Sequence, residues 1–409
     1  MAVVVAGCDG VHAPERSPSA AAKAATGGPT PTTVAMTRAF DSVYHRYKRQ
    51  ILGMCVGAID ARTTAVKCYG KVARGSKQRP TSATLFQIGS ISKTLTATLL
   101  ALRVHQGAVR LEDPLQRYIP AADGSARVPR SLTLLDVATH HSGLPRETPV
   151  ANSLDISSLD QYFAAAGRCE STPGCPVGAP GEQYVYSNYA YGILGQALGL
   201  HDGYSESSYS AWEKDNRARV TDPLGMTDTA SGLGWRASAS ADFDARRAHA
   251  TVGYPPQEAH PPFFPPPPYA DAAAGLYSSP RDMLRWLSFS MGLSGTPALD
   301  AARPLLYDTA RLTRPREDPG DPTRRIGLAW RIDTKGSGRS KTTCISKPGE
   351  SRGFSSHMVF VKHRPLGAFV MLNTVPDNPT APGIGTAVVN ALPSATGGAR
   401  TTRTCPVSG

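Results

Sequence analysis

The order of strand-like and helix-like segments constrains the fold of this chain more than any other feature. Strand patterns occur near both ends of the chain, whereas apolar residues at helical spacing fill its middle. The strand-like segments are 51–59, 65–72, 341–346, 354–361 and 367–373, and 84–88 is a short extended run. This order predicts an α/β (α+β) fold in which an antiparallel sheet, flanked by helices, is built from both ends of the chain. The expected domains are a discontinuous α/β domain, residues 38–89 and 280–405, and a mainly helical domain, residues 90–279.

Helix signals support this division. A capping pair, Thr133 and Asp136, predicts a helix over 133–141, and Ser279 followed by Pro280 and Asp282 predicts another helix start. Gly107 is expected to end the helix that carries Leu95, Leu99 and Leu102. Further helices are expected at 34–50, 189–200 and 382–392. The segment 254–269 holds eight prolines and is expected to be extended and irregular.

The first residues resemble a bacterial lipoprotein signal. Val5-Ala-Gly-Cys8 matches a lipobox, in which small residues precede the Cys that receives the lipid, although the apolar run before it is short. The following segment, 9–33, is rich in Ala, Pro, Ser, Thr and Gly and reads as a flexible tether. We therefore expect residues 1–37 to be a truncated signal and tether, with Cys8 as a candidate lipid anchor to the membrane.

Composition narrows the class of partner. The 409 residues are 40% hydrophobic, which is enough for a core, and no run of about 18 apolar residues predicts a membrane-spanning helix. The net charge is +12, but the basic residues are dispersed and form no basic helix or RNP-like run. We expect no nucleic-acid partner, no metal and no cofactor.

The chain has seven cysteines, so at least one stays unpaired if the other six form disulfides. Cys8, the candidate lipid site, is the cysteine that we expect to stay unpaired. If the turn after the first strand is centred between residues 61 and 62, Cys55 and Cys68 face each other across a hairpin, within reach of a disulfide. Cys169 with Cys175 and Cys344 with Cys405 complete the candidate set, and buried free thiols are the alternative. Paired cysteines would place the protein outside the cytoplasm.

Ser90-Ile-Ser-Lys93 is the first segment that points to chemistry. Residues three apart share a helix face, so a Ser hydroxyl and a Lys amine can meet at the start of a helix. The same helix N-terminus presents backbone N–H groups and the positive end of the helix dipole, which favour an oxyanion. Alone, this pattern is weak, because it occurs by chance in many chains.

Two later segments strengthen the pattern. Tyr186-Ser-Asn188 precedes a helix, and Lys347-Pro-Gly349 follows a strand. In this order the three motifs resemble the penicillin-recognising serine hydrolases. Further matching segments, among them 113–115, 138–145, 223–226 and 275–280, resemble the class C β-lactamase branch and its AmpH-type D-alanyl-D-alanine carboxypeptidase/endopeptidases. The resemblance spans roughly residues 38–393 and implies the family's α/β domain with a helical domain.

The resemblance implies a role for each motif residue. Ser90 would be the nucleophile, Lys93 and Tyr186 would take its proton, and Asn188 would bind Lys93 and the substrate amide. The oxyanion hole would be formed by the N–H groups of Ser90 and Glu350. A Tyr that acts as a base near pH 7 needs about 4 kcal/mol, which one cation at about 4 Å can supply at an effective dielectric of 20. The alternative, a neutral Lys93 as base with Tyr186 as relay, stays open.

The third motif departs from the family pattern, which is Lys-Thr-Gly. Pro348 has neither the hydroxyl nor an N–H, and in relatives that hydroxyl helps to bind the substrate carboxylate. The candidate substrate-binding residues at this end of the site are Gly349, Glu350, Ser351 and Arg352, of which Ser351 or Arg352 could compensate. Residues 349–353 also match the G-x-S-x-G elbow of α/β-hydrolases, but no His follows in the required order.

The sequence thus predicts a serine hydrolase of the bacterial periplasm that forms an acyl-enzyme with β-lactams or D-Ala-D-Ala peptides. A carboxylesterase of the same fold is the main alternative, and Pro348 makes it more credible. A penicillin-binding sensor that is acylated without turnover is the other.

Overall fold

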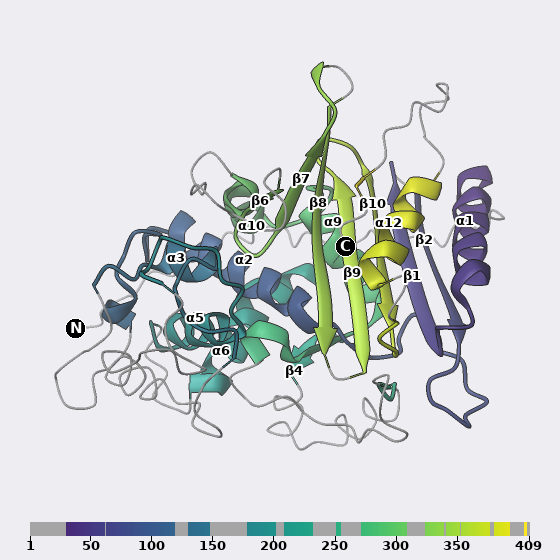
Figure 1. Ribbon diagram of the computed structural model, residues 1–409, viewed down its shortest axis with the longest axis horizontal. Helices are drawn as coiled ribbons and strands as arrows, with labels where there is room; N and C mark the ends of the chain where they lie inside the picture. Colours follow the sequence, from purple (N-terminus) through teal and green to yellow (C-terminus); the bar gives the residue numbers. More distant parts are fainter. Residues whose placement is uncertain are drawn as a thin grey trace, which may run out of the picture.

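Strands from the N-terminal and C-terminal parts of the chain form one seven-stranded antiparallel sheet (Figure 1). The computed structural model describes residues 30–61, 63–118, 130–147, 178–201, 208–231, 251–254, 271–308, 324–338, 341–351, 353–376, 380–392 and 405–406. The strand order is β2-β1-β10-β9-β8-β7-β6. These strands are β1 (Gly53–Asp60), β2 (Thr63–Gly70), β6 (Arg324–Ile326), β7 (Arg331–Lys335), β8 (Thr342–Ser351), β9 (Phe354–Val361) and β10 (Leu366–Leu372). Sequence-distant strands are thus neighbours, since β1 pairs with β10.

The hairpin β1–β2 has the register that the sequence predicts. Cys55 lies opposite Cys68, and Asp60 lies opposite Thr63. The two sulfur atoms of Cys55 and Cys68 are at bonding distance, with Cα atoms 4.1 Å apart. Cys344 is bonded in the same way to Cys405 near the C-terminus.

Helices cover both faces of the sheet (Figure 1). On one face, α1 and α12 pack through Met36, Phe40 and Ile384 against apolar residues of β1, β9 and β10. On the other face, α9 and the helical part of the molecule pack against the sheet in a larger core. This core includes Trp286 of α9, Leu95 of α2 and Phe369 of β10. The bounds are α1 (Pro31–Tyr47), α2 (Ser92–His105), α3 (Leu134–Ala138), α5 (Asn188–His201), α6 (Ser208–Asn216), α9 (Pro280–Ser290), α10 (Pro297–Ala302) and α12 (Ala381–Ala391).

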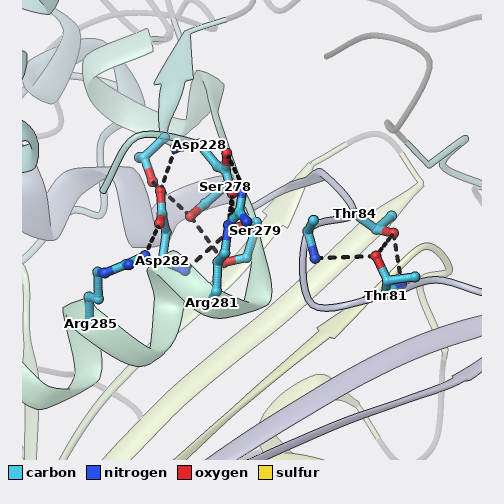
Figure 2. Close-up of polar contacts among 10 residues, drawn as sticks. Thr81, Thr84, Asp228, Ser278, Ser279, Arg281, Asp282 and Arg285 are labelled. Carbon is cyan, nitrogen blue, oxygen red and sulfur yellow. Dashed lines mark hydrogen bonds and ion pairs between the residues drawn. The ribbon is translucent and has the colours of Figure 1, made fainter. Parts of the chain in front are cut away.

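Both helix starts predicted from caps are present. Thr133 and Asp136 form a reciprocal capping box at α3. At α9, the Ser279 hydroxyl accepts from the Asp282 N–H and donates to Asp228 (Figure 2). The buried Asp282 carboxylate accepts from the Asp228 N–H at 2.7 Å and from Arg285 at 2.8 Å, and burial raises its pKa. This network ties α9 to the loop that carries Asp228.

A second, three-stranded sheet lies beside the helices, with the order β3-β5-β4. Its strands are β3 (Phe86–Gln87), β5 (Leu276–Ser278) and β4 (Ala230–Ser231). Sequence reasoning anticipated only β3, as a short extended run. Two strands of the large sheet, β6 and β7, were also missed, because they are short and lack clear alternation of apolar and polar residues. No helix within the described residues combines the length and apolarity needed to cross a bilayer.

Candidate active site

Ser90 lies in a short 3-10 turn, Gly89–Ile91, that leads directly into α2. Gly89 has a φ of +53°, and a Cβ atom there would lie 2.4 Å from the Glu350 backbone nitrogen on β8. Two hydroxyls hold this turn, because Ser356 donates to the Ile88 carbonyl and Ser92 donates to the Gly89 carbonyl, each at 2.8 Å. The absence of a side chain at residue 89 therefore allows Ser90 to sit against the edge of the sheet.

Lys93 is the second residue of α2, about one turn after Ser90, and is fully buried. Its Nζ is 3.3 Å from Ser90 Oγ, 2.6 Å from Asn188 Oδ1 and 2.7 Å from the Ala273 carbonyl oxygen. Ala273 belongs to a π-helical turn, Asp271–Gly275, packed beside α2. Burial, followed by the charge of Lys347, holds the pKa of Lys93 well below its ordinary value. The structure thus favours a neutral amine next to the Ser90 hydroxyl.

Tyr186 reaches Ser90 from the segment before α5. Its hydroxyl donates to Ser90 Oγ at 2.7 Å. Lys93 and Lys347 lie 5.0 and 5.2 Å from the centroid of its ring. Burial is the largest influence on Tyr186 and raises its pKa to about 12, although the hydrogen bond with Ser90 and the charges of Arg146 and Arg331 act to lower it. Of the two alternatives that the sequence left open, the structure therefore favours a protonated Tyr186 over a phenolate.

Lys347 lies on β8, facing Tyr186, and is 3% exposed. Sequence analysis expected the strand to end before it, but β8 continues to Ser351. The pairing with β7 ends at Arg331 and Ser346, so β8 is an edge strand from Lys347 onward. An edge position tolerates Pro348, which has no N–H to donate to a neighbouring strand. The unpaired edge of β8 therefore forms one wall of the site.

These residues enclose a cavity of about 400 Å³. The predicted residues among its described lining are Ser90, Tyr186, Asn188, Lys347, Gly349 and Glu350. Ser351 is not among them, because its hydroxyl donates to Gln87 Oε1 at 2.6 Å. Arg352, Cys8, Cys169 and Cys175 lie outside the described residues. Among the described residues, no cluster of His, Cys, Asp or Glu could hold a metal ion.

Sequence reasoning missed two charged residues of the segment that follows α3. Glu147 Oε1 accepts from Asn188 Nδ2 at 2.6 Å, which orients the amide so that its oxygen faces Lys93. Arg146 lies 5.3 Å from the centroid of the Tyr186 ring. Nothing local marks either residue, since each meets the site only where Arg146 and Glu147 pack against the start of α5.

His140 was also missed, although it is buried in the wall beside Tyr186. Its ring centroid lies 4.3 Å from that of Tyr186, and its Nδ1 accepts from the Ser187 N–H at 3.2 Å. Burial, followed by the charges of Lys347 and Lys93, holds its pKa well below the ordinary value. The neutral ring therefore carries its proton on Nε2, which has no hydrogen-bond partner among the described residues. A φ of +62° at His140 is unusual for a residue with a side chain and could have been found only from the structure.

Arg331 is the fourth missed residue. It lies at the start of β7, in the last pair before β8 becomes the edge of the sheet, and it lines the cavity. Its charge contributes to lowering the pKa of Lys347, after burial. The pattern around it, Gly-Leu-Ala-Trp-Arg, carries no motif, so only the pairing of β7 with β8 reveals its place.

The arrangement can perform nucleophilic acyl transfer. A hydroxyl, Ser90 Oγ, lies within reach of a buried amine and a tyrosine hydroxyl, which is the geometry of an activated nucleophile. The Glu350 backbone on β8 packs directly against Gly89, the residue before Ser90, so backbone N–H groups of both segments are available near the turn that carries this hydroxyl.

Comparisons with known proteins agree with the chemistry that this geometry allows. A family model described as "Beta-lactamase" matches residues 32–392. The chain is 29% identical over 336 residues to the D-alanyl-D-alanine-carboxypeptidase/endopeptidase AmpH of Escherichia coli K12, a match that covers 79% of this chain and 80% of that protein. It is 25% identical to a beta-lactamase of the same organism, over 88% of this chain and 96% of that protein.

The solved structures include a class C beta lactamase from Rhodobacter sphaeroides, with a TM-score of 0.65 and 24% identity, over 87% of this chain and 97% of that chain. This likeness confirms the predicted fold class, an antiparallel sheet with helices on both sides and a mainly helical part.

Proposed function

Because this chain belongs to the beta-lactamase family, we propose that it is a serine hydrolase that forms an acyl-enzyme on Ser90 with β-lactams or D-Ala-D-Ala peptides. The observation that carries this proposal is the contact of Ser90 Oγ with both Tyr186, at 2.7 Å, and Lys93, at 3.3 Å. A hydroxyl between these two groups can lose its proton as it attacks a carbonyl carbon.

Lys93 is the base in this proposal. A neutral amine has two N–H donors and one lone pair. The two shortest contacts of Nζ are to acceptors, the oxygens of Asn188 and Ala273, which leaves the lone pair for the Ser90 hydroxyl. The lowered pKa of Lys93 keeps a larger fraction of the amine neutral than an ordinary lysine would have. Lys93 therefore takes the Ser90 proton and becomes an ammonium.

Tyr186 is the proton relay. Its pKa of about 12 keeps the hydroxyl protonated while Ser90 attacks. As the tetrahedral intermediate collapses, the C–N bond breaks, the leaving nitrogen takes the Tyr186 proton, and Lys93 returns the Ser90 proton to Tyr186. Proton count and charge then balance over acylation. A water molecule repeats the sequence in the opposite direction to release Ser90.

The oxyanion of the intermediate is bound by the N–H groups of Ser90 and Glu350. The close approach of Gly89 to the Glu350 backbone supports this role, because it holds the two segments against each other. Losing one such donor typically costs about 10²–10³ in rate. Asn188 and Lys347, which both line the cavity, contact the substrate in this proposal.

The test is covalent labelling followed by turnover. Fluorescent penicillin should label the wild-type protein and a Ser294→Ala control, in which an exposed hydroxyl far along the chain is removed. Ser90→Ala should not be labelled, and peptide mass spectrometry should place the adduct on Ser90. Undiminished label on Ser90→Ala would refute the mechanism. A chromogenic cephalosporin then separates turnover from a stable adduct.

A carboxylesterase is the second candidate, and Pro348 favours it. The proline presents neither a hydroxyl nor an N–H to the cavity beside Lys347. Hydrolysis of a neutral p-nitrophenyl ester without any labelling by penicillin would support this candidate. Labelling without turnover would instead support a penicillin-binding sensor.

We place the protein in the bacterial cell envelope, in the periplasm, tethered through Cys8. The pairs Cys55–Cys68 and Cys344–Cys405 support an oxidising compartment. Metabolic labelling with a fatty-acid analogue of the full chain and of Cys8→Ala tests the anchor, and equal labelling of the two would contradict it.

A further inference from the structure

The π-helical turn that begins at Asp271 is bound to α2 through two successive carbonyl oxygens. The Ala272 carbonyl accepts from the Thr96 hydroxyl at 2.7 Å. The Ala273 carbonyl accepts from the Lys93 amine, also at 2.7 Å. Because adjacent carbonyl groups share one stretch of backbone, any shift of this turn would move the acceptor of the proposed base. The position of the Lys93 amine therefore depends on what holds the turn in place.

Backbone bonds hold the end of the turn. Leu276, the first residue after it, lies opposite Ser231 in the pairing of β5 with β4. The Leu276 carbonyl accepts from the Ile88 N–H at 3.0 Å, and its N–H donates to the Ser92 hydroxyl at 3.2 Å. The beginning of the turn is held differently, because its first residue, Asp271, contributes a buried side chain.

Asp271 shares this buried site with Glu213 of α6. The two residues are 3% and 7% exposed. The Ser231 hydroxyl donates to Glu213 Oε2 at 2.6 Å, and the Ser231 N–H donates to Oε1 at 3.0 Å. The same hydroxyl forms a side-chain hydrogen bond with Asp271, whose Oδ1 has no partner among the described residues. One hydroxyl thus links the two carboxyl groups.

The number of protons determines the charge of this group. Two hydrogen bonds between the Ser231 hydroxyl and carboxyl oxygens need two protons, and a hydroxyl supplies only one. The second proton must belong to one of the carboxyl groups. Glu213 accepts two hydrogen bonds and lies near the charge of Arg217, which favours its ionised form. Burial, followed by the charge of Glu213, holds the pKa of Asp271 well above its ordinary value, so Asp271 carries the proton.

We propose that Asp271 is a positioning residue for Lys93. Its protonated carboxyl group donates to Ser231 and fixes the beginning of the turn. The turn then presents the Ala273 carbonyl to the Lys93 amine, which lies 3.3 Å from Ser90 Oγ. The inference rests on the proposed function, in which Lys93 is the base. Asp271 is not among the described residues that line the cavity, so it acts on the reaction through the turn and not on the substrate.

The test compares two substitutions of similar size. Asp271→Asn keeps a neutral group with an N–H donor for Ser231, whereas Asp271→Leu keeps the size but has no donor. Asp282→Asn and Asp282→Leu are the matched controls. Asp282 is also a buried carboxyl group that accepts hydrogen bonds, but it lies on α9 and contacts Asp228.

Single-turnover labelling by fluorescent penicillin, followed over a range of concentrations, gives three quantities for each variant. The maximal rate constant reports the chemical step, and the concentration at half-maximal rate reports binding. The final amount of label per molecule reports the fraction of protein that is correctly folded. A residue that only stabilises the fold would change this final amount and leave the rate constant as it is.

For Asp271→Leu, we expect the maximal rate constant to fall about 10- to 100-fold, because a small displacement of a catalytic group is enough for such a loss. The concentration at half-maximal rate should change less than about threefold, and the final amount of label should equal that of the wild type. Asp271→Asn should keep the wild-type rate constant within about threefold, because it restores the donor. Both Asp282 variants should acylate at the wild-type rate. Circular dichroism verifies that each variant is folded, and Asp271→Ala replaces Asp271→Leu in the comparison if the latter does not fold.

Three results would overturn the inference. A wild-type rate constant in folded Asp271→Leu would mean that the turn does not need this side chain. Less label at an unchanged rate constant would mean that Asp271 serves only the stability of the fold. An equal loss in Asp271→Asn and Asp271→Leu would mean that a neutral donor at this position is not what holds the turn. Failure of the proposed function looks different, because Ser90 of the wild type would then not be labelled, which would refute the role of Lys93 and with it this inference.

Discussion

Replacing Gly89 with alanine should separate the position of Ser90 from the general stability of the fold. Gly89 has a φ of +53°, and a Cβ there would lie 2.4 Å from the nitrogen and 2.7 Å from the oxygen of Glu350. Both are backbone atoms of β8, which cannot rotate out of the way as the end of a side chain can. The substitution must therefore move the Ser90 turn and β8 apart.

The magnitude follows from two contributions. A left-handed conformation costs alanine roughly 1–2 kcal/mol, and overpacking a filled site adds about 1–3 kcal/mol. Gly107→Ala is the matched control, because Gly107 also has a positive φ, +71°, but no neighbouring atom lies within 4 Å of the place that its Cβ would take. Gly89→Ala should thus lose about 1–3 kcal/mol more unfolding free energy than Gly107→Ala.

The assay measures urea unfolding and single-turnover acylation by fluorescent penicillin. If the Glu350 N–H binds the oxyanion as proposed, moving β8 away from the Ser90 turn should lower acylation by Gly89→Ala by about 10²–10³. Gly107→Ala should acylate at the wild-type rate. Wild-type acylation by a folded Gly89→Ala variant would show that this close approach does not build the oxyanion site.

Three further predictions concern buried titratable groups. Lys93 must be neutral to act as a base, and its pKa is lowered. We therefore expect kcat/KM to be retained at neutral pH and to fall as the pH drops through that pKa. A kcat/KM that rises toward acid pH would contradict this. Burial holds the pKa of His357 at about 3, against about 6.5 in the unfolded chain, so the unfolded state binds the proton first as pH falls. Unfolding free energy should therefore decrease by roughly 1.4 kcal/mol per pH unit between those values, and His357→Leu should reduce this slope in urea titrations. His140→Phe keeps a ring beside Tyr186 but removes the acceptor for the Ser187 N–H, whereas His140→Asn keeps an acceptor and tolerates the positive φ. We expect His140→Asn to retain more of kcat and an unshifted pH profile, and the reverse order would show that the ring contact matters more.

Local patterns in the sequence predicted much of the fold. The register of the β1–β2 hairpin could be predicted from the position of its turn alone, because the turn fixes which residues face each other across the two strands. The caps of α3 and α9 were visible because each capping contact lies within three residues. The short strands β6 and β7 were not visible, since their stability comes from pairing with β8 and with each other.

The candidate site divides in the same way. Ser90 and Lys93 could be found because they are three residues apart at the start of one helix, and the later motifs were found from their resemblance to a family. Tyr186 was identified, but its state of protonation was not, because burial outweighs the nearby cations and burial is not written in the local sequence.

The sequence by itself determined the candidate residues of the proposed reaction, their order along the chain and the kinds of element that carry them. Tertiary structure decided which side chains meet them: His140 against Tyr186, Glu147 on Asn188, and Arg331 beside Lys347. The physical reason is that helix caps, turns and i to i+3 contacts depend on neighbours in the chain. The charge, burial and hydrogen bonding of a cavity depend on segments that only strand pairing and core packing bring together.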